Sequence, residues 1–114
     1  MKENRRFRRR SLLFELKVSD KSTGVALGRV ANLTPDGLML VNADRIVDNS
    51  VMTLRIELPE LIFGKATIDC DAKCMWCKPG INGKLFEAGF QLLEMGELDI
   101  QTIVALITKY RVLD

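Results

Sequence analysis

Residues 12–37 read LLFELKVSDKSTGVALGRVANLTPDG, and this stretch predicts a β-hairpin. From Leu12 to Val18 every second side chain is apolar, with charged residues on the opposite face, which is typical of a strand with one buried face. Residues 20–24 are rich in turn formers, and Val25 to Leu33 are expected to form the returning strand. The hairpin would then bring Asn32 back beside the start of the first strand.

An arginine-rich segment precedes the hairpin. Residues 1–10 hold six basic side chains and one acidic side chain, whereas the rest of the chain holds 11 Lys+Arg against 14 Asp+Glu. We predict that residues 1–11 form a flexible ligand-binding arm, because closely spaced arginines repel one another and offer little apolar surface to bury. Anions are the ligands that such an arm would hold.

Beyond the hairpin the pattern predicts more short strands and then a helix. Strands are expected at Gly37–Val41, Val51–Leu58, Lys65–Lys78 and Leu85–Leu93, with turn signals at Asn42 to Asp48, Pro59 and Pro79-Gly80. From Leu98 to Tyr110 apolar residues recur at helical spacing, with acidic residues first and Lys109 and Arg111 last. The predicted fold of residues 12–114 is one mainly β domain, a six-stranded antiparallel β-barrel whose C-terminal α-helix packs on it or closes one mouth.

Two polar motifs, one on each side of the hairpin, resemble the paired signatures of the PilZ family. The segment Arg5-Arg6-Phe7-Arg8-Arg9 fits R-x-x-x-R, and Asn32-Leu33-Thr34-Pro35-Asp36-Gly37 fits [D/N]-x-[S/T]-x-x-G. The later segments Cys74-Met75-Trp76 and Glu87-Ala88-Gly89-Phe90 are similar to the last strands of that family, so the resemblance covers nearly the whole chain. It implies a PilZ-like barrel that binds cyclic di-GMP, a bacterial second messenger.

The resemblance also implies which residues bind the ligand. The expected contacts are Arg5, Arg6, Arg9, Asn32, Thr34 and Gly37, with Arg10 and Trp76 flanking them. Arg6 and Arg10 satisfy the R-x-x-x-R spacing as well as Arg5 and Arg9 do, so the register stays open, and Trp76 has core packing as its alternative role.

These residue types suit a nucleotide with two phosphates. A guanidinium group forms paired hydrogen bonds with phosphate and reaches the O6 and N7 acceptors of guanine. The Asn32 amide and the Thr34 hydroxyl are able to read a base edge or a phosphate oxygen. Gly37 permits a positive φ and would leave room for a ligand to approach the backbone.

The predicted function is therefore a cyclic di-GMP receptor or adaptor. Its arm would become ordered on ligand binding, and the signal would pass to a separate effector protein. Two alternatives remain: a PilZ-like protein-interaction module without a ligand, and a basic protein that binds nucleic acid without sequence preference.

Three cysteines form a second pattern. Cys70, Cys74 and Cys77 match the C-x-x-x-C-x-[aromatic]-C spacing by which radical S-adenosylmethionine enzymes hold an iron–sulfur cluster. A complete (β/α) barrel needs about 250 residues, however, and alternation along a strand would set Cys70 and Cys74 about 13 Å apart with Cys77 on the other face. We therefore expect buried, reduced core cysteines and no metal site; the odd count favours a reducing compartment.

Other functions are disfavoured by what the sequence lacks. It has no histidine and no glycine-rich nucleotide loop, so we expect neither an enzyme nor a cofactor. The apolar run at residues 12–14 is interrupted by Glu15 and Lys17, which argues against a signal peptide, and no stretch is long enough to span a membrane. A cytoplasmic location is expected.

Overall fold

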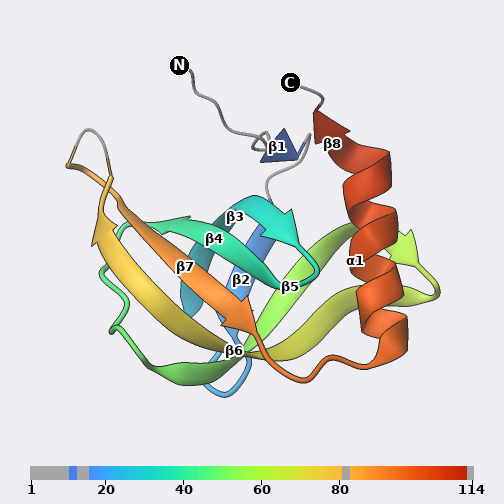
Figure 1. Ribbon diagram of the computed structural model, residues 1–114, viewed down its shortest axis with the longest axis horizontal. Helices are drawn as coiled ribbons and strands as arrows, with labels where there is room; N and C mark the ends of the chain where they lie inside the picture. The colour runs from blue at the N-terminus through green and yellow to red at the C-terminus, as the bar shows by residue number, and fades with distance from the viewer. Residues whose placement is uncertain (1–10, 13–15, 81–82, 113–114) are drawn as a thin grey trace.

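Six antiparallel strands close into a barrel in the computed structural model, which describes residues 11–12, 16–80 and 83–112 (Figure 1). The strands are β2 (Leu16–Asp20), β3 (Ala26–Thr34), β4 (Gly37–Asn42), β5 (Val51–Ile62), β6 (Lys65–Pro79) and β7 (Phe86–Leu92). Around the barrel they pair in the order β2-β3-β4-β7-β6-β5. Helix α1 (Glu97–Tyr110) follows β7. The predicted β-barrel with a C-terminal helix is confirmed.

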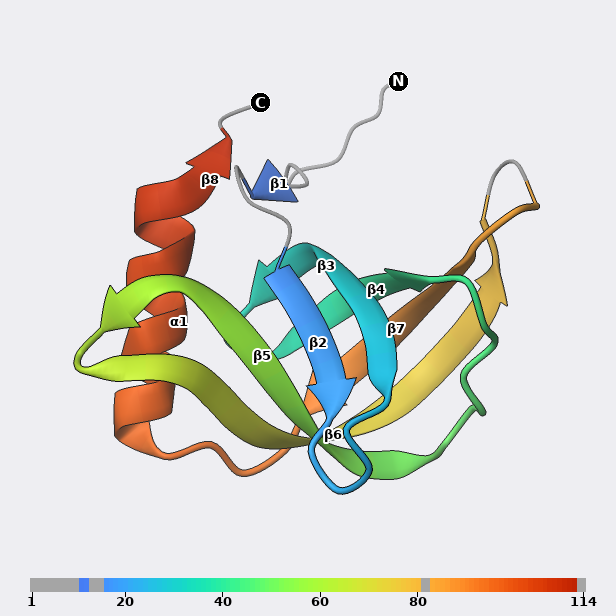
Figure 2. The ribbon, with the colours of Figure 1, turned by 180° about the vertical axis from the view of Figure 1, so that it is seen from behind.

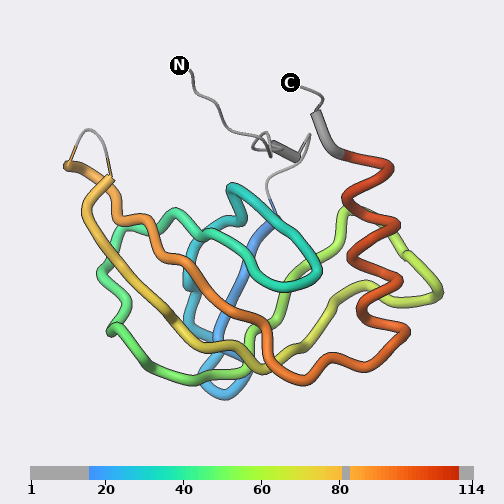
Figure 3. Tube along the Cα trace, viewed as in Figure 1, coloured from blue at the N-terminus to red at the C-terminus, as the bar shows by residue number. Residues whose placement is uncertain are grey.

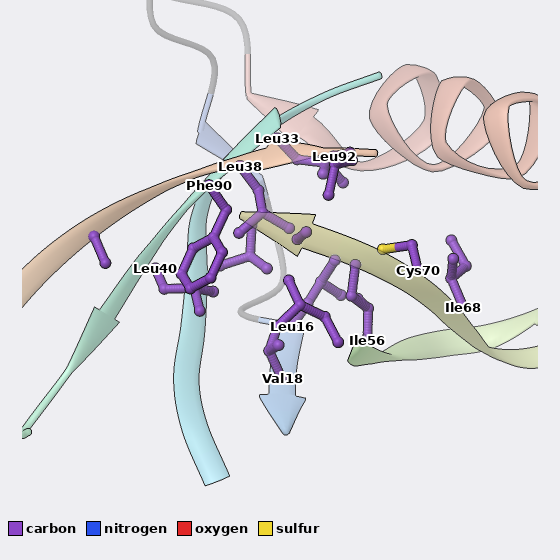
Figure 4. Packing of buried hydrophobic residues seen from close by; sticks show 14 of the residues in the cluster. Leu16, Val18, Leu33, Leu38, Leu40, Ile56, Ile68, Cys70, Phe90 and Leu92 are labelled. Carbon is purple, nitrogen blue, oxygen red and sulfur yellow. The ribbon is translucent and has the colours of Figure 1, made fainter. Parts of the chain in front are cut away.

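Alternation of apolar and polar residues builds the interior, as the sequence predicts. On β5, for example, Leu54 and Ile56 are fully buried, while Arg55 between them lies on the outer surface. Figure 4 shows inward side chains of β2, β4 and β7, among them Leu16 and Phe90, meeting in this core. The domain therefore has one continuous apolar centre.

Helix α1 completes the core at one end of the barrel. It lies against β3 and β5 (Figures 1 and 2). Its Ile103 and Leu106 side chains are fully buried. The opposite face of the helix is exposed and includes Leu98, which the helical pattern had placed in the apolar stripe. The predicted packing of the helix on the barrel is confirmed.

Polar contacts hold both ends of the helix to the long hairpin of β5 and β6. Near the first turn, Lys65 Nζ lies 2.5 Å from Asp99 Oδ1. Near the last turn, Lys109 and the Tyr110 hydroxyl both donate to the Glu60 carboxylate, and these two hydrogen bonds, Lys109 foremost, lower the pKa of Glu60. The hairpin therefore fixes the direction of the helix across the barrel end.

The first strand was predicted to begin at Leu12, but the first barrel strand, β2, begins at Leu16. Residues Ser11–Leu12 form a separate short strand, β1, which pairs with β8 (Arg111–Val112) outside the barrel. Leu12 is paired with Arg111, while β1 still lies close to β3, the strand that carries Asn32. Arg111 has left the helix in which the charge pattern placed it. Pairing with a segment almost a full chain length away leaves no signal in local periodicity.

The turn predicted at Pro59 was also wrong. Strand β5 runs through Pro59 to Ile62, and the chain reverses at Phe63 and Gly64, which have φ values of 51° and 77°. The register between β5 and β6 shifts between Glu57 and Ile62. Such an irregularity accepts proline because no regular ladder hydrogen bond is needed from its nitrogen.

A bulge in β6 changes which side chains face the core near the end of that strand. The register with β7 shifts between Cys74 and Trp76, so one extra residue stands in β6 at this point. As a result Trp76 points outward and is 38% exposed, whereas Cys77 points inward and is 7% exposed. The expectation that Cys77 faces the other side from Cys70 and Cys74 was therefore wrong.

All three cysteines are free and buried, as predicted. Burial raises the pKa of the Cys70 thiol to about 11, so this side chain is a neutral thiol near pH 7. The Cys77 sulfur accepts a hydrogen bond of 3.4 Å from the backbone nitrogen of Ile46. Within the described part of the chain, no group of three or more His, Cys, Asp or Glu side chains is arranged to hold a metal ion.

Acidic residues on the outside of β6 are held by neighbouring strands. Asp69 accepts two hydrogen bonds from Arg55, at 2.8 and 3.0 Å, and lies 3.3 Å from Lys21 Nζ. The Arg55 hydrogen bond is the main reason why the pKa of Asp69 is lowered. Asp71 accepts a hydrogen bond from the Thr53 hydroxyl. These contacts cross-link the barrel wall.

No helix in the described residues is long and apolar enough to cross a membrane.

Leu106→Ala is expected to lower the free energy of unfolding by about 2–5 kcal/mol, because it leaves a cavity under the helix. Val104→Ala on the same helix is the matched control; this side chain is 47% exposed, and its loss is expected to change stability by about 0.5 kcal/mol or less. Urea denaturation measures both. Equal stability of the two variants would show that the helix is not part of the core.

Candidate functional site

A groove of about 410 Å³ lies on the barrel wall where the turn between β3 and β4 meets β6 and β7. Its walls come from four strands and include Asn32, Thr34, Asp36, Gly37, Leu38, Met39, Met75, Trp76, Gly89, Phe90 and Gln91. The fold thus brings the predicted site residues Asn32, Thr34 and Gly37 together with Trp76. The other predicted contacts, Arg5, Arg6, Arg9 and Arg10, lie outside the described residues.

Pairing of β7 on both sides creates this groove. Gly37 lies opposite Gln91 in the β4–β7 ladder, and Trp76 lies opposite Gly89 in the β6–β7 ladder. Figure 3 follows the same path, with β7 running between β4 and β6. Gly37 of the second motif and Trp76, which lie far apart in the sequence, are therefore both brought next to β7.

The Thr34 hydroxyl shapes the turn at the edge of the groove. It accepts hydrogen bonds of 3.2 Å from the backbone nitrogens of Asp36 and Gly37, and its contact with the Gly37 carbonyl is 3.3 Å. This is the side-chain-to-backbone bonding by which threonine stabilises turns. Contact with a ligand oxygen would require the hydroxyl to release one of these partners.

Gly37 is needed for a reason other than the predicted one. It does not adopt the positive φ that glycine permits. A Cβ atom at this position would stand 2.6 Å from the carbonyl oxygen of Phe90 in the neighbouring strand. Only glycine lets the backbones of β4 and β7 approach this closely at the groove.

Trp76 forms one wall of the groove. The bulge before it turns the indole out of the core, and the ring lies against Gly89 of β7. The ammonium group of Lys78 lies 5.2 Å from the ring centroid, within the range of a cation–π contact. The structure thus places this residue at the proposed site rather than in the core.

Sequence reasoning missed two neighbours of these residues. Met39 and Gln91 lie on the outer face of β4 and β7, between buried apolar residues. Alternation indicates that both face outward, but only the β4–β7 register shows that they share a groove.

The groove is lined by both apolar and polar residues but carries little charge of its own. Asp36 is the only charged side chain among its described lining residues, and Lys78 stands beside the ring of Trp76. The Asn32 amide supplies hydrogen-bond donors and an acceptor, and the indole offers a flat aromatic surface. This combination can bind a planar base, whereas binding of a phosphate requires positive charge from another segment.

A model of the PilZ domain family matches residues 3–109. The chain is also similar in fold to an inhibitor of motility from Bacillus subtilis (MotI/DgrA), with a TM-score of 0.70 and 16% identity over 94% of this chain and 51% of that one. The chain thus spans about half the length of that protein. No match was found among curated proteins.

A second structure of similar fold is the PilZ domain of YcgR from Escherichia coli, solved with c-di-GMP. The TM-score is 0.64 and the identity is 12%, over 94% of each chain. At this level of identity, both structures support the fold that the register and the barrel closure establish.

Thr34→Val should lower the free energy of unfolding by about 1 kcal/mol, because it removes the hydroxyl that holds the turn while keeping the side-chain shape. Thr34→Ser retains the hydroxyl and is the matched control. Urea denaturation compares the two. If the valine variant is as stable as the serine variant, the hydroxyl does not hold the turn.

Proposed function

The chain belongs to the PilZ domain family, and from that premise we propose that it is a cyclic di-GMP receptor and adaptor. Its ligand contacts are Arg5, Arg6 and Arg9 in the arm and Asn32, Thr34 and Gly37 at the groove, with Arg10 and Trp76 flanking them. The observation that carries the proposal is the groove itself, which gathers the second motif and the indole from separate strands.

The charges of the two parts indicate that the groove binds a base and the arm binds the phosphates. The described lining of the groove offers aromatic and amide groups and a single carboxylate, which suit a base better than a phosphate. Six basic residues in the first ten supply the positive charge that two phosphates require. Arginine adds geometry, because its planar fork makes two parallel hydrogen bonds to one phosphate.

Ligand binding would join the two parts. In the free arm, the arginines repel one another; two phosphates neutralise that repulsion and hold the arm against the groove. Binding is then an ordering transition of the arm, in which the ligand itself forms part of the contact surface.

The protein would act on its target through this altered surface. PilZ domains are receptor and adaptor modules, and we assign no catalytic residue to this chain. The target is a separate effector protein, and the cytoplasmic location expected from the sequence stays a prediction.

Calorimetric titration with cyclic di-GMP at physiological salt tests the proposal. We expect a dissociation constant in the micromolar range or below, and no displacement of cyclic di-GMP by GMP. Arg9→Ala should weaken binding at least about tenfold, because a charge-assisted hydrogen bond contributes about 1.5–3 kcal/mol. Asn32→Ala should weaken it as well.

Arg45→Ala is the matched control, since Arg45 is exposed and does not line the groove. Its affinity for cyclic di-GMP should equal that of the wild type. Absence of binding to the wild type contradicts the proposal and favours the ligand-free interaction module. Equal binding of any polyanion, with a steep dependence on salt and no effect of Asn32→Ala, favours the nucleic-acid alternative.

A further inference from the structure

The indole of Trp76 is placed by two features of the backbone that lie outside the R-x-x-x-R and [D/N]-x-[S/T]-x-x-G motifs. The first is the bulge in β6 between Cys74 and Trp76. Before it, Cys70, Ala72 and Cys74 all face the core, and continued alternation would place Trp76 there too. The single extra residue reverses this alternation and brings the indole to the groove.

The second feature is the glycine opposite the ring. A Cβ atom at Gly89 would lie 2.3 Å from Nε1, 2.4 Å from Cε2 and 2.7 Å from Cζ2 of Trp76. Real Cβ atoms essentially never approach other atoms so closely, so the indole occupies the space that any side chain at position 89 would need. The Trp76 ring thus fits against β7 because residue 89 has no side chain.

The close approach at Gly89 differs from the one at Gly37, the other glycine of the groove with a neighbour this close. At Gly37 a Cβ atom would meet a backbone oxygen, and relief would require the strands to move. At Gly89 the three nearest atoms all belong to the Trp76 side chain, which is 38% exposed and therefore has solvent on one side. A substitution at Gly89 therefore moves the indole and leaves the ladder in place.

We propose that Gly89 is a positioning residue for ligand binding: together with the β6 bulge it holds the Trp76 indole where a guanine of the ligand stacks on it. The proposal rests on the proposed function for the identity of the ligand. A base that stacks on an aromatic side chain adds to the free energy of binding. A ring that is turned out of the groove no longer overlaps the base, so that contribution is lost.

The test compares the binding of cyclic di-GMP to Gly89→Ala, Trp76→Ala and the double variant by calorimetry. Each single variant should bind about tenfold more weakly than the wild type, the lower part of the range measured for base stacking. In the Trp76→Ala background, Gly89→Ala should cause no further loss, because there is no ring left to displace. Gly96→Ala is the control, since that position has open space and lies outside the groove.

Fluorescence supplies a second readout, because Trp76 is the only tryptophan in the chain. Ligand should change the emission of the wild type and of Gly96→Ala. The emission of ligand-free Gly89→Ala should already differ from that of the wild type, and ligand should change it little. Thermal unfolding verifies that the alanine variant is folded.

Three results would overturn the proposal while the proposed function survives. One is a wild type that binds cyclic di-GMP and a folded Gly89→Ala that binds it equally well. Another is Trp76→Ala with full affinity, a variant that leaves the backbone and Gly89 untouched. The third is a double variant in which the two losses add fully, because Gly89 would then act independently of the ring. If the wild type itself binds no cyclic di-GMP, the proposed function fails and stacking of this ligand fails with it.

Discussion

The pairing of β7 with β4 on one side and with β6 on the other is the interaction on which the site depends. It closes the barrel, and the same backbone hydrogen bonds set the turn after β3 beside the end of β6. Glycine permits this proximity twice, at Gly37 for the neighbouring strand and at Gly89 for an indole. The groove is thus a consequence of barrel closure and two missing side chains.

Much of the fold could be predicted because local patterns determine it. Alternation predicts the strands, and the change to helical spacing predicts α1, whose buried Ile103 and Leu106 complete the core. The errors arose where pairing partners are distant or irregular. Periodicity gave no sign that Leu12 pairs with Arg111, or that an extra residue before Trp76 reverses the facing of Cys77.

The site was predicted in part for the same reason. The second motif spans the end of β3, the turn and the start of β4, so its spacing alone keeps Asn32, Thr34 and Gly37 together. Gly37 serves close strand packing rather than a positive φ. Met39 and Gln91 could not be foreseen, because they become neighbours only through the register of two strands. The arginines of the arm lie outside the described residues, and their role stays a prediction.

A titration of ¹⁵N-labelled protein with cyclic di-GMP, followed by amide chemical shifts, would show whether one ligand joins the arm to this groove. We expect the largest changes in the arm and at Asn32 to Gly37, Trp76 and Gly89 to Gln91. Changes confined to the arm, or centred on the separate groove around Gly28, Arg29 and Asn42, would contradict this expectation.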